Sequence, residues 1–311
     1  LLPMQGGGME IFMNFIQLSK YLDTFHKVYD IPGCDCCIYE NHNNVFRRKY
    51  GFSDAKKTTF KDLYFMHSAA KLVCCTAILR LSEEGKISLS DKVSKYLSDF
   101  SDDMTIEEFL KEYSKTYDFE QHKCNHKNLS RITEAITGIS LDEYLEKNIF
   151  VPLHMKNTSF GLNDANRKRI GAQYVLTDKG ERIKSDKSLD ELMSKNEGCL
   201  ITSVGDYARF AETLCNYGVS KHNFRLLSKE NVKNLINNVI YNETTEENCF
   251  VCIGYNGSFV SIDLDNRITI IYAQHVKNCG TLQMEIYPKM REIAYECVGV
   301  HKWSKGFNVF P

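Results

Sequence analysis

The sequence lacks the features that would tie it to a membrane or to nucleic acid. No apolar run in the 311 residues approaches the roughly 18 residues that a membrane-spanning helix needs. Basic and acidic residues are nearly balanced, 39 against 40, and there is no polybasic block or basic stripe. We therefore expect neither a membrane span nor a nucleic-acid partner. The apolar fraction of 43% predicts a sizeable folded core.

Two further absences concern targeting and metals. The opening "LLPMQGGGMEIF" has no basic stretch followed by an apolar one, so it is not an intact signal peptide; a signal removed earlier would leave no trace. The nine histidines show no H-E-x-x-H spacing, and "CDCC" at 34–37 has no second Cys/His cluster at a zinc-finger distance. We predict no metal and no cofactor.

Cysteine, by contrast, is abundant. The chain has 12, and several are adjacent or alternate within apolar runs, as at 34–37 and 74–75. Adjacent residues of a strand face opposite sides, which suits small buried side chains better than a disulfide framework. The pattern predicts packed thiols in a reducing compartment, so we expect a cytoplasmic protein.

The order of the expected elements predicts the fold class. The runs 34–40 and 45–52 flank the Asn-rich "NHNN" and indicate a β-hairpin. A helical pattern runs from Ser68 to a stop at Gly85. Further helices are expected at 105–113, 129–138 with Gly138 closing it, 141–150 with Ser140 as its cap, 203–218 and 285–300.

Antiparallel strands are expected again late in the chain, within 249–264 and 267–276. Strands at both ends and helices between them indicate an α+β protein in which the two ends share one sheet. We place the sheet domain at 1–62 and 195–311, and a mostly helical domain at 63–194. A cleft between the two domains is the expected site.

One short motif carries chemistry. Ser68 and Lys71 in "HSAAK" are three residues apart, so their side chains lie on one helical face. A serine at a helix start meets unpaired N–H groups that can hold an oxyanion. Lysine can take the serine proton only if burial or a nearby charge keeps it partly neutral. The motif alone is weak, because serine is also a common helix cap.

The surroundings of the motif resemble the serine β-lactamase and penicillin-binding-protein family, in its class C and esterase-like branch. Four long segments agree in order over about residues 30 to 298, and they are 31–54, 67–100, 134–160 and 198–218. The resemblance implies a β-lactamase/transpeptidase-like fold, with an antiparallel sheet flanked by helices and a mostly helical domain. It also implies a serine hydrolase with Ser68 as nucleophile and Lys71 as its proton acceptor.

The second element of the family, S-D-N or Y-x-N, is replaced. The tyrosine position falls on Gln121, the middle one on His122 and the asparagine on Lys123. Glutamine cannot accept a proton as a phenolate does. Lys123 is a candidate substitute base, because two nearby ammonium groups lower each other's pKa; His122 is a lesser candidate. The alternative is that these replacements arose in a protein that no longer turns over substrate.

The third element, K-T-G or H-x-G in relatives, reads Cys252, Ile253, Gly254 here. Gly254 is retained, so the N–H groups of Ser68 and Tyr255 would form the oxyanion hole that the resemblance implies, whatever the neighbouring side chains. Cys252 is expected to be a packed thiol rather than a nucleophile, since it stands on a strand.

Two functions stay open at this point. The first is an acyl-enzyme hydrolase, related to β-lactamases, D-Ala-D-Ala carboxypeptidases and esterases, that acts on a β-lactam, a D-amino-acid peptide or a small ester. The second is a catalytically impaired, β-lactamase-like protein that binds a ligand, because both later motifs are replaced. Either one has a small molecule or peptide as its partner.

Overall fold

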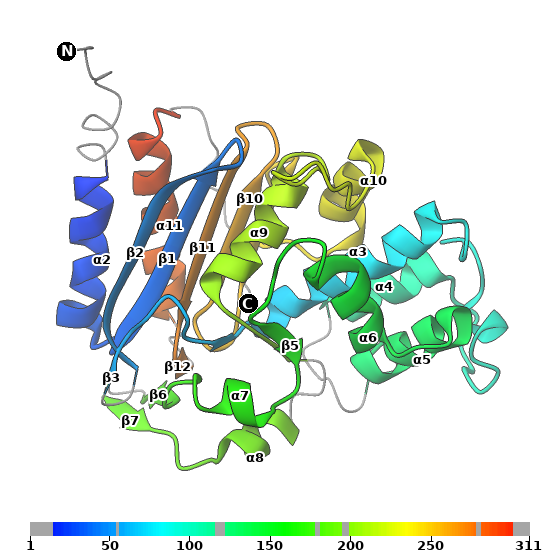
Figure 1. Ribbon diagram of the computed structural model, residues 1–311, viewed down its shortest axis with the longest axis horizontal. Coiled ribbons are helices and arrows are strands. Elements are labelled where there is room, and N and C mark those ends of the chain that lie inside the picture. Colours follow the sequence, from blue (N-terminus) through cyan, green and yellow to red (C-terminus); the bar gives the residue numbers. More distant parts are fainter. Residues whose placement is uncertain are drawn as a thin grey trace.

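A computed structural model describes residues 15–53, 56–115, 122–177, 181–194, 199–277 and 281–300. Its centre is a six-stranded antiparallel sheet in the order β3-β2-β1-β11-β10-β9 (Figure 1). The strands are β1 (Gly33–Glu40), β2 (Asn43–Ser53), β3 (Lys56–Lys57), β9 (Cys249–Ile253), β10 (Phe259–Asp263) and β11 (Ile268–Gln274). Both ends of the chain contribute to this sheet, which confirms the predicted α+β arrangement.

The predicted N-terminal hairpin is confirmed. Glu40 pairs with Asn43, and the two residues between them, Asn41 and His42, have φ of 46° and 67°. Positive φ at both central positions is the geometry that matches the twist of a two-residue hairpin, and asparagine adopts it at low cost. The Asn-rich turn therefore sets the register of β1 on β2.

The stretch 249–264 forms two strands rather than one. A tight turn separates β9 from β10, with the Gly254 N–H donating to the Ser258 carbonyl at 2.8 Å and Gly257 at φ 80°. Gly257 lies against the side chain of Gln274, so a side chain there would clash as well as strain the backbone. The turn leaves β9 at the edge of the sheet, next to the start of the helix that carries Ser68.

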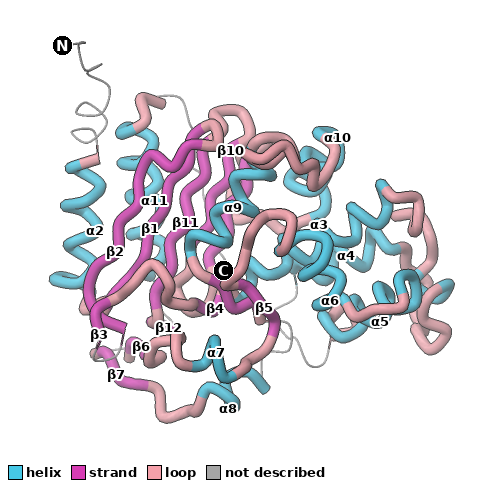
Figure 2. Tube along the Cα trace, in the orientation of Figure 1, coloured by secondary structure: helices cyan, strands magenta, loops and turns pink. Residues whose placement is uncertain are grey.

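Helices cover both faces of the sheet (Figures 1 and 2). Side chains alternate along each strand, so neighbouring residues enter different cores. On one face, α2 (Ile16–Tyr29) and α11 (Thr281–Cys297) pack on residues that include Cys36, Ile38, Ile270 and Tyr272. On the other, α3 (Ala70–Glu83) and α9 (Val204–Cys215) pack on residues that include Cys37, Val260 and Ile271.

The helical part of the chain lies beside this second face (Figure 2). It contains α4 (Ile106–Lys115), α5 (His126–Thr137), α6 (Leu141–Leu145) and the π-helix η3 (Glu146–Phe150). Gly138 ends α5 at φ 77°, and the Ser140 hydroxyl accepts the Glu143 N–H at the start of α6. Both predicted boundaries are confirmed, while the expected helix 141–150 changes to π geometry at Glu146.

Two small sheets connect the parts. One has the order β4-β8-β5 and the other β12-β6-β7. Their strands are β4 (Tyr64–Phe65), β5 (Thr158–Phe160), β6 (Tyr174–Leu176), β7 (Arg182–Lys184), β8 (Leu200–Thr202) and β12 (Val276–Lys277). The remaining helices are η1 (His67–Ala69), η2 (Val93–Lys95), α7 (Asp164–Arg167), α8 (Leu189–Ser194), α10 (Lys229–Asn234) and η4 (Leu235–Val239). β8 lies in the predicted sheet domain but pairs with β4 and β5 of the predicted helical domain. The limits of the two domains stay a prediction.

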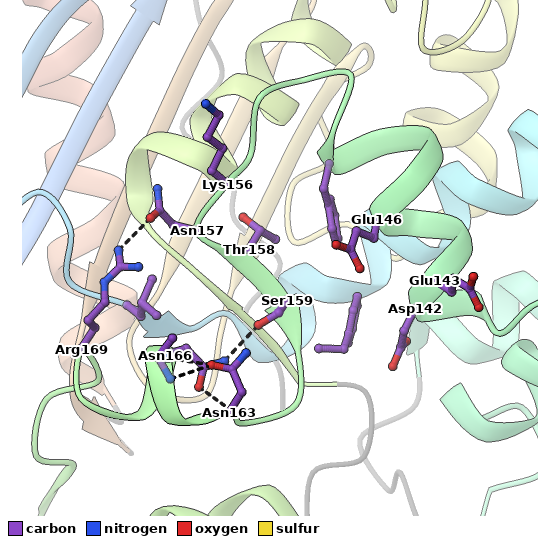
Figure 3. Close-up of a pocket in the computed structure, with 14 residues that line it drawn as sticks. Asp142, Glu143, Glu146, Lys156, Asn157, Thr158, Ser159, Asn163, Asn166 and Arg169 are labelled. Atoms are coloured by element: carbon purple, nitrogen blue, oxygen red, sulfur yellow. Dashed lines mark hydrogen bonds between the residues drawn. The ribbon is translucent and has the colours of Figure 1, made fainter.

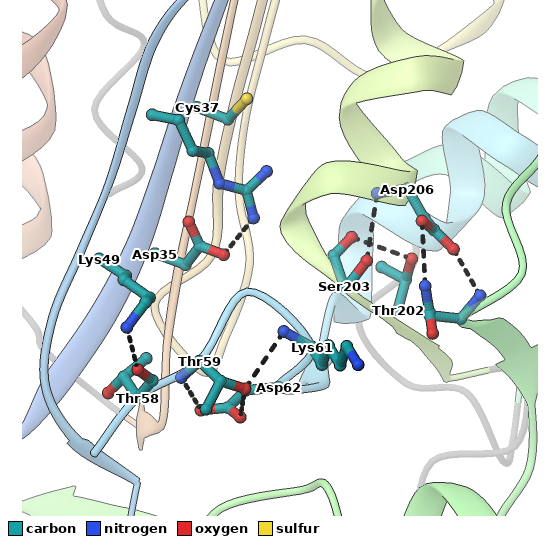
Figure 4. A network of polar contacts seen from close by, with 12 residues as sticks. Asp35, Cys37, Lys49, Thr58, Thr59, Lys61, Asp62, Thr202, Ser203 and Asp206 are labelled. Carbon is teal, nitrogen blue, oxygen red and sulfur yellow. Dashed lines mark hydrogen bonds and ion pairs between the residues drawn. The ribbon is translucent and has the colours of Figure 1, made fainter.

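Polar contacts of buried acidic residues join neighbouring strands and connect α9 to a segment beside it (Figure 4). Buried Asp35 on β1 accepts a hydrogen bond from Arg47 on β2, inside the sheet. Near the start of α9, buried Asp206 accepts the backbone N–H of Asn157. The second contact joins α9 to the segment that leads into β5, and so to the helical part.

The eleven cysteines within the described residues are free thiols, and all are buried. Ten of them lie in the two cores that flank the sheet and Cys199 lies in a third, smaller cluster, which confirms the expected packing role. No helix in the described part of the chain is long and apolar enough to cross a membrane.

Candidate active site

Ser68 lies where a strand turns into a helix. The Met66 N–H donates to the Leu200 carbonyl at 2.9 Å, which fixes the chain after β4 to β8. His67 then has φ 42°, a left-handed value that is uncommon outside glycine and turns the chain sharply. Ser68 follows in the first turn, where N–H groups have no acceptor within the helix. The turn leaves the Ser68 side chain partly exposed, while its neighbours are buried.

Lys71 lies one turn further along, in the first turn of α3, and is only 2% exposed. Its ammonium donates to the Ser114 carbonyl at the end of α4, at 3.2 Å. Burial lowers the pKa of Lys71, opposed by the negative charge available at Cys252, Cys75 and Glu243. A buried amine with a lowered pKa is what proton abstraction from a serine requires.

Ser68 and Lys71 line one small cavity between α3, the segment after η4, and β9. Its volume is about 10 Å³, close to the space of one water molecule. The lining residues are Ser68, Lys71, Ser114, Ile240, Tyr241, Glu243, Phe250, Val251 and Cys252. The structure therefore brings together the first motif and the first residue of the altered third motif.

Glu243 is a site residue that the sequence analysis missed. It is buried, and its carboxylate accepts the Ile253 N–H at 2.8 Å. Burial raises the pKa of Glu243 to about 8, against the opposing effects of the Ile253 N–H and the Lys71 charge. Its run, "NETTEEN" at 242–248, contains three glutamates, and no local pattern separates this one from the others.

The outer edge of β9 is hydrogen-bonded to Asn242 and Glu243, the first two residues of this run. The Asn242 side-chain oxygen accepts the Val251 N–H at 2.8 Å. The Glu243 N–H donates to the Val251 carbonyl at 3.0 Å. Together with the Glu243–Ile253 bond, these contacts hold the Glu243 carboxyl at a defined place in the cavity wall.

The third-motif residues lie against the Ser68 segment. A side-chain carbon on Gly254 would stand 2.0 Å from the Ser258 hydroxyl and 3.0 Å from the Met66 carbonyl, so a larger residue would force the Ser258 side chain to move. The Tyr255 ring meets His67 edge to face at 6.0 Å between centroids, and the Lys277 ammonium lies 4.4 Å from its centroid. Tyr255 is thus placed beside the turn that leads to Ser68, and the two-donor oxyanion hole stays a prediction.

Two neighbours of Ser68 are held neutral. Cys252 lines the cavity, and burial raises the pKa of its thiol well above the ordinary value. His67 is buried, and burial together with the Lys277 charge lowers its pKa to about 4. A protonated thiol and a neutral imidazole fit packing roles, as expected for Cys252.

The second-motif residues lie elsewhere or outside the described residues. Gln121 is outside them. The His122 ring nitrogen Nδ1 accepts the Cys124 N–H at 3.1 Å. Lys123 is half exposed and pairs with Asp102 at 2.7 Å, with a second bond to the Ser101 hydroxyl at 2.9 Å. Among the described residues that line the Ser68 cavity, neither His122 nor Lys123 is present.

A larger pocket of about 470 Å³ lies between α6, η3, β5 and α7 (Figure 3). Asp142, Glu143 and Glu146 line one side, and Lys156 and Arg169 are also among its residues. Its side-chain amides are mostly bound to one another or to the backbone, as in the capping box of α7. Size alone would favour this pocket, but the serine–lysine pair is in the smaller one.

Within the residues that the structure describes, no three His, Cys, Asp or Glu side chains are grouped so that they could hold a metal ion. The side chains that line the Ser68 cavity offer hydroxyls, an amine, a carboxyl, a thiol and a phenol.

The sheet covered by helices on both faces, with Ser-x-x-Lys at the start of α3, defines the class of penicillin-binding-protein and β-lactamase-like serine hydrolases. The family model described as Beta-lactamase matches residues 18–275, most of the chain, so the protein belongs to the β-lactamase family.

Individual relatives are distant. The teichoic acid D-alanine hydrolase of Staphylococcus aureus is 25% identical over 242 residues, which cover 64% of this chain and 60% of that protein. This chain thus matches well under two thirds of the length of that curated relative. A penicillin-binding protein homologue from Caulobacter crescentus has a similar fold, with a TM-score of 0.74 at 15% identity over 91% of this chain and 97% of that one.

A second solved structure has the same fold. EstCE1, described as a hydrolase with promiscuous acyltransferase activity, aligns with a TM-score of 0.72 at 13% identity, covering 92% of this chain and 99% of that one. These likenesses establish the β-lactamase/transpeptidase-like fold.

Proposed function

We propose that this protein is a serine hydrolase that forms an acyl-enzyme on Ser68. The observation that carries the proposal is that Ser68 and the buried Lys71 line one cavity at the start of α3. A serine hydroxyl needs a neighbouring base, and a buried lysine with a lowered pKa can supply a neutral amine. Both parts of that requirement are met by residues three positions apart.

In the proposed reaction, the Ser68 oxygen attacks the carbonyl carbon of an ester or amide as its proton moves to Lys71. The N–H groups of Ser68 and Tyr255 hold the negative oxygen of the tetrahedral intermediate. The C–O or C–N bond to the leaving group then breaks, and water hydrolyses the acyl-serine. The retained Gly254, which packs closely against Ser258 and the Met66 carbonyl, supports the oxyanion part of the proposal.

The substrate class is proposed as a small ester or amide: a β-lactam, a D-amino-acid derivative or a simple ester. Two comparisons support this range, since one relative is a teichoic acid D-alanine hydrolase and one neighbour of similar fold is a hydrolase with acyltransferase activity.

Covalent labelling tests the proposal. The protein is incubated with a fluorophosphonate and, separately, with a labelled penicillin, and intact masses are taken for wild type, Ser68→Ala and Ser90→Ala. Ser90 is an exposed serine after α3 and serves as the matched control. An adduct on wild type and Ser90→Ala that is missing from Ser68→Ala is the expected result.

A binding protein without turnover is the second candidate, and the replaced second motif favours it. Lys123, at the asparagine position, is engaged by Asp102 at the surface. No adduct from either probe on wild type would support this candidate and overturn the hydrolase. A penicillin adduct that forms on Ser68 but is never released would identify an acyl trap.

A further inference from the structure

The cavity beside Ser68 contains a carboxyl group that the Ser-x-x-Lys motif does not account for. Glu243 enters it from the segment after η4, and Lys71 enters from α3. We propose that Glu243 is the acid and base that works with Lys71 in this cavity, giving a proton to the leaving group and taking one from the hydrolytic water. The inference rests on the proposed acyl transfer at Ser68.

The geometry selects Glu243 over the other candidates. Glu243 lines the same cavity of about 10 Å³ as Ser68, a space for about one water through which a proton can pass. The Ile253 N–H and the bonds of the Glu243 backbone to β9 fix its position. The sequence candidates Lys123 and His122 make their contacts outside the described lining of this cavity.

The titratable groups that face Glu243 come from three elements. Lys71 comes from α3, Cys252 from β9, and Tyr241 from the same segment as Glu243. Burial raises the pKa of both the Cys252 thiol and the Tyr241 phenol, so each keeps its proton at neutral pH. Among the described lining residues, Lys71 and Glu243 are therefore the two whose pKa values burial moves toward neutrality.

Burial acts on these two groups in opposite directions. It lowers the pKa of Lys71 and raises that of Glu243 to about 8, because it disfavours the charged form of each. Their mutual attraction opposes this effect. The pair can thus hold one proton as ammonium and carboxylate, or as neutral amine and carboxylic acid.

The neutral form of the pair supplies a base and an acid together. In acylation, the Ser68 O–H bond breaks, its oxygen bonds to the carbonyl carbon, and the proton goes to the Lys71 amine. The carbonyl π electrons move to the oxygen and return as the bond to the leaving group breaks. The leaving oxygen or nitrogen takes the Glu243 proton, leaving ammonium, carboxylate and acyl-serine.

Deacylation restores the starting state. Water gives a proton to the Glu243 carboxylate as its oxygen bonds to the acyl carbon. The bond from that carbon to the Ser68 oxygen then breaks, and the serine oxygen takes a proton from Lys71. The products are the carboxylic acid, the serine hydroxyl, the neutral amine and the protonated Glu243, so each proton is accounted for.

The test uses Glu243→Gln, Glu243→Asp and the control Glu247→Gln on the full chain. Gln keeps the side-chain size and an oxygen for the Ile253 N–H, and Glu247 is an exposed glutamate four residues away. Release of the acyl group from Ser68 is followed by intact mass, and ester hydrolysis is measured from pH 5 to 10. Thermal denaturation reports whether each variant is folded.

We expect Glu243→Gln to slow acyl-enzyme release by about 10²- to 10⁴-fold, so that the adduct accumulates. For kcat/KM, which reports acylation, wild type should show a bell-shaped pH profile, and the variant only the limb that rises with pH as Lys71 loses its proton. Glu243→Asp should recover part of the rate, and Glu247→Gln should match wild type.

Two results would overturn the inference alone: a wild-type kcat/KM profile with no limb that falls at high pH, or a folded Glu243→Gln variant that releases the acyl group at the wild-type rate. In both cases wild type still labels at Ser68, so the proposed function survives. No adduct on wild type would overturn the proposed function, and this inference with it.

Discussion

Two buried acidic residues of this protein lie beside different cations, one an arginine and the other a lysine. Asp35 lies inside the sheet against Arg47, and Glu243 lies in the Ser68 cavity with Lys71 (Figure 4 shows the first pair). Burial raises the pKa of Asp35 to about 7 and that of Glu243 to about 8. In both cases the neighbouring cation opposes the effect of burial, so the two carboxylates are electrostatically alike.

The two pairs differ in whether the cation can release its proton. Burial alone would lower the pKa of Arg47, but the charges and hydrogen bonds of Asp35 and Cys37 together outweigh it and the pKa is raised, so the guanidinium keeps its proton. The pKa of Lys71 is lowered, and an amine can give its proton up. The Asp35–Arg47 pair can therefore only hold charge in place, whereas the Glu243–Lys71 pair can move a proton.

The largest expected effect comes from breaking the proton-moving pair at its cation. Lys71→Met should slow labelling of Ser68 by about 10²- to 10⁴-fold, because the serine loses its base. Its midpoint of urea denaturation at pH 6 should change little, since Glu243 can be protonated there. The measurements are the rate of adduct formation and urea denaturation. Lys111→Met, on the surface of α4, is the control.

Breaking the fixed pair should affect stability. Arg47→Met leaves Asp35 buried without its cation, and we expect a loss of about 3 to 5 kcal/mol in unfolding free energy at pH 8. The loss should be smaller at pH 5, where Asp35 can take up a proton. Arg48→Met is the matched neighbour, because Arg48 pairs with the half-exposed Asp23 and should lose at most about 1 kcal/mol. Equal losses for the two variants would contradict the comparison.

The pH dependence of stability measures Glu243 directly. Its folded-state pKa of about 8 exceeds the ordinary 4.5, so the folded protein binds the extra proton between these values. Its stabilising contribution is complete below the ordinary pKa and is lost as pH rises through 8. From pH 5 to 7, unfolding free energy of wild type relative to Glu243→Gln should fall by about 1.4 kcal/mol per pH unit. A flat difference would mean that the carboxyl is already ionised.

The smallest effect is expected at Lys123. Its ammonium is half exposed and pairs with Asp102, so Lys123→Ala should leave the hydrolysis rate and the denaturation midpoint nearly unchanged. The sequence suggested Lys123 as a substitute base. Ester turnover that disappears in Lys123→Ala, with an amine-like pKa in wild type, would support that role and require Lys123 to leave Asp102.

Local signals predicted much of the fold. Asn41 and His42 define the hairpin turn, and Gly138 and Ser140 mark a helix end and a helix start by their backbone and hydroxyl chemistry. The break within 249–264 was not predicted, because both flanks are apolar and β-rich. The break depends on Gly257, in the turn between β9 and β10, packing against Gln274 at the end of β11.

Local signals likewise predicted part of the site. Ser68 and Lys71 are neighbours on one helix, so their spacing was enough to place them together. Glu243 reaches them from a distant part of the chain through the pairing of its segment with β9. No local pattern distinguishes it from Glu246, which instead binds Arg291, because only tertiary contacts separate the two roles.

The contacts of Asn242 and Glu243 with β9 also limit how a ligand can approach. An edge strand with free N–H and C=O groups would accept an extended polypeptide by strand addition, or pair with another copy and aggregate. Here Asn242 and Glu243 already bind the Val251 N–H, the Val251 carbonyl and the Ile253 N–H. A peptide could align along this edge only by displacing them, and with them the carboxyl in the wall of the Ser68 cavity.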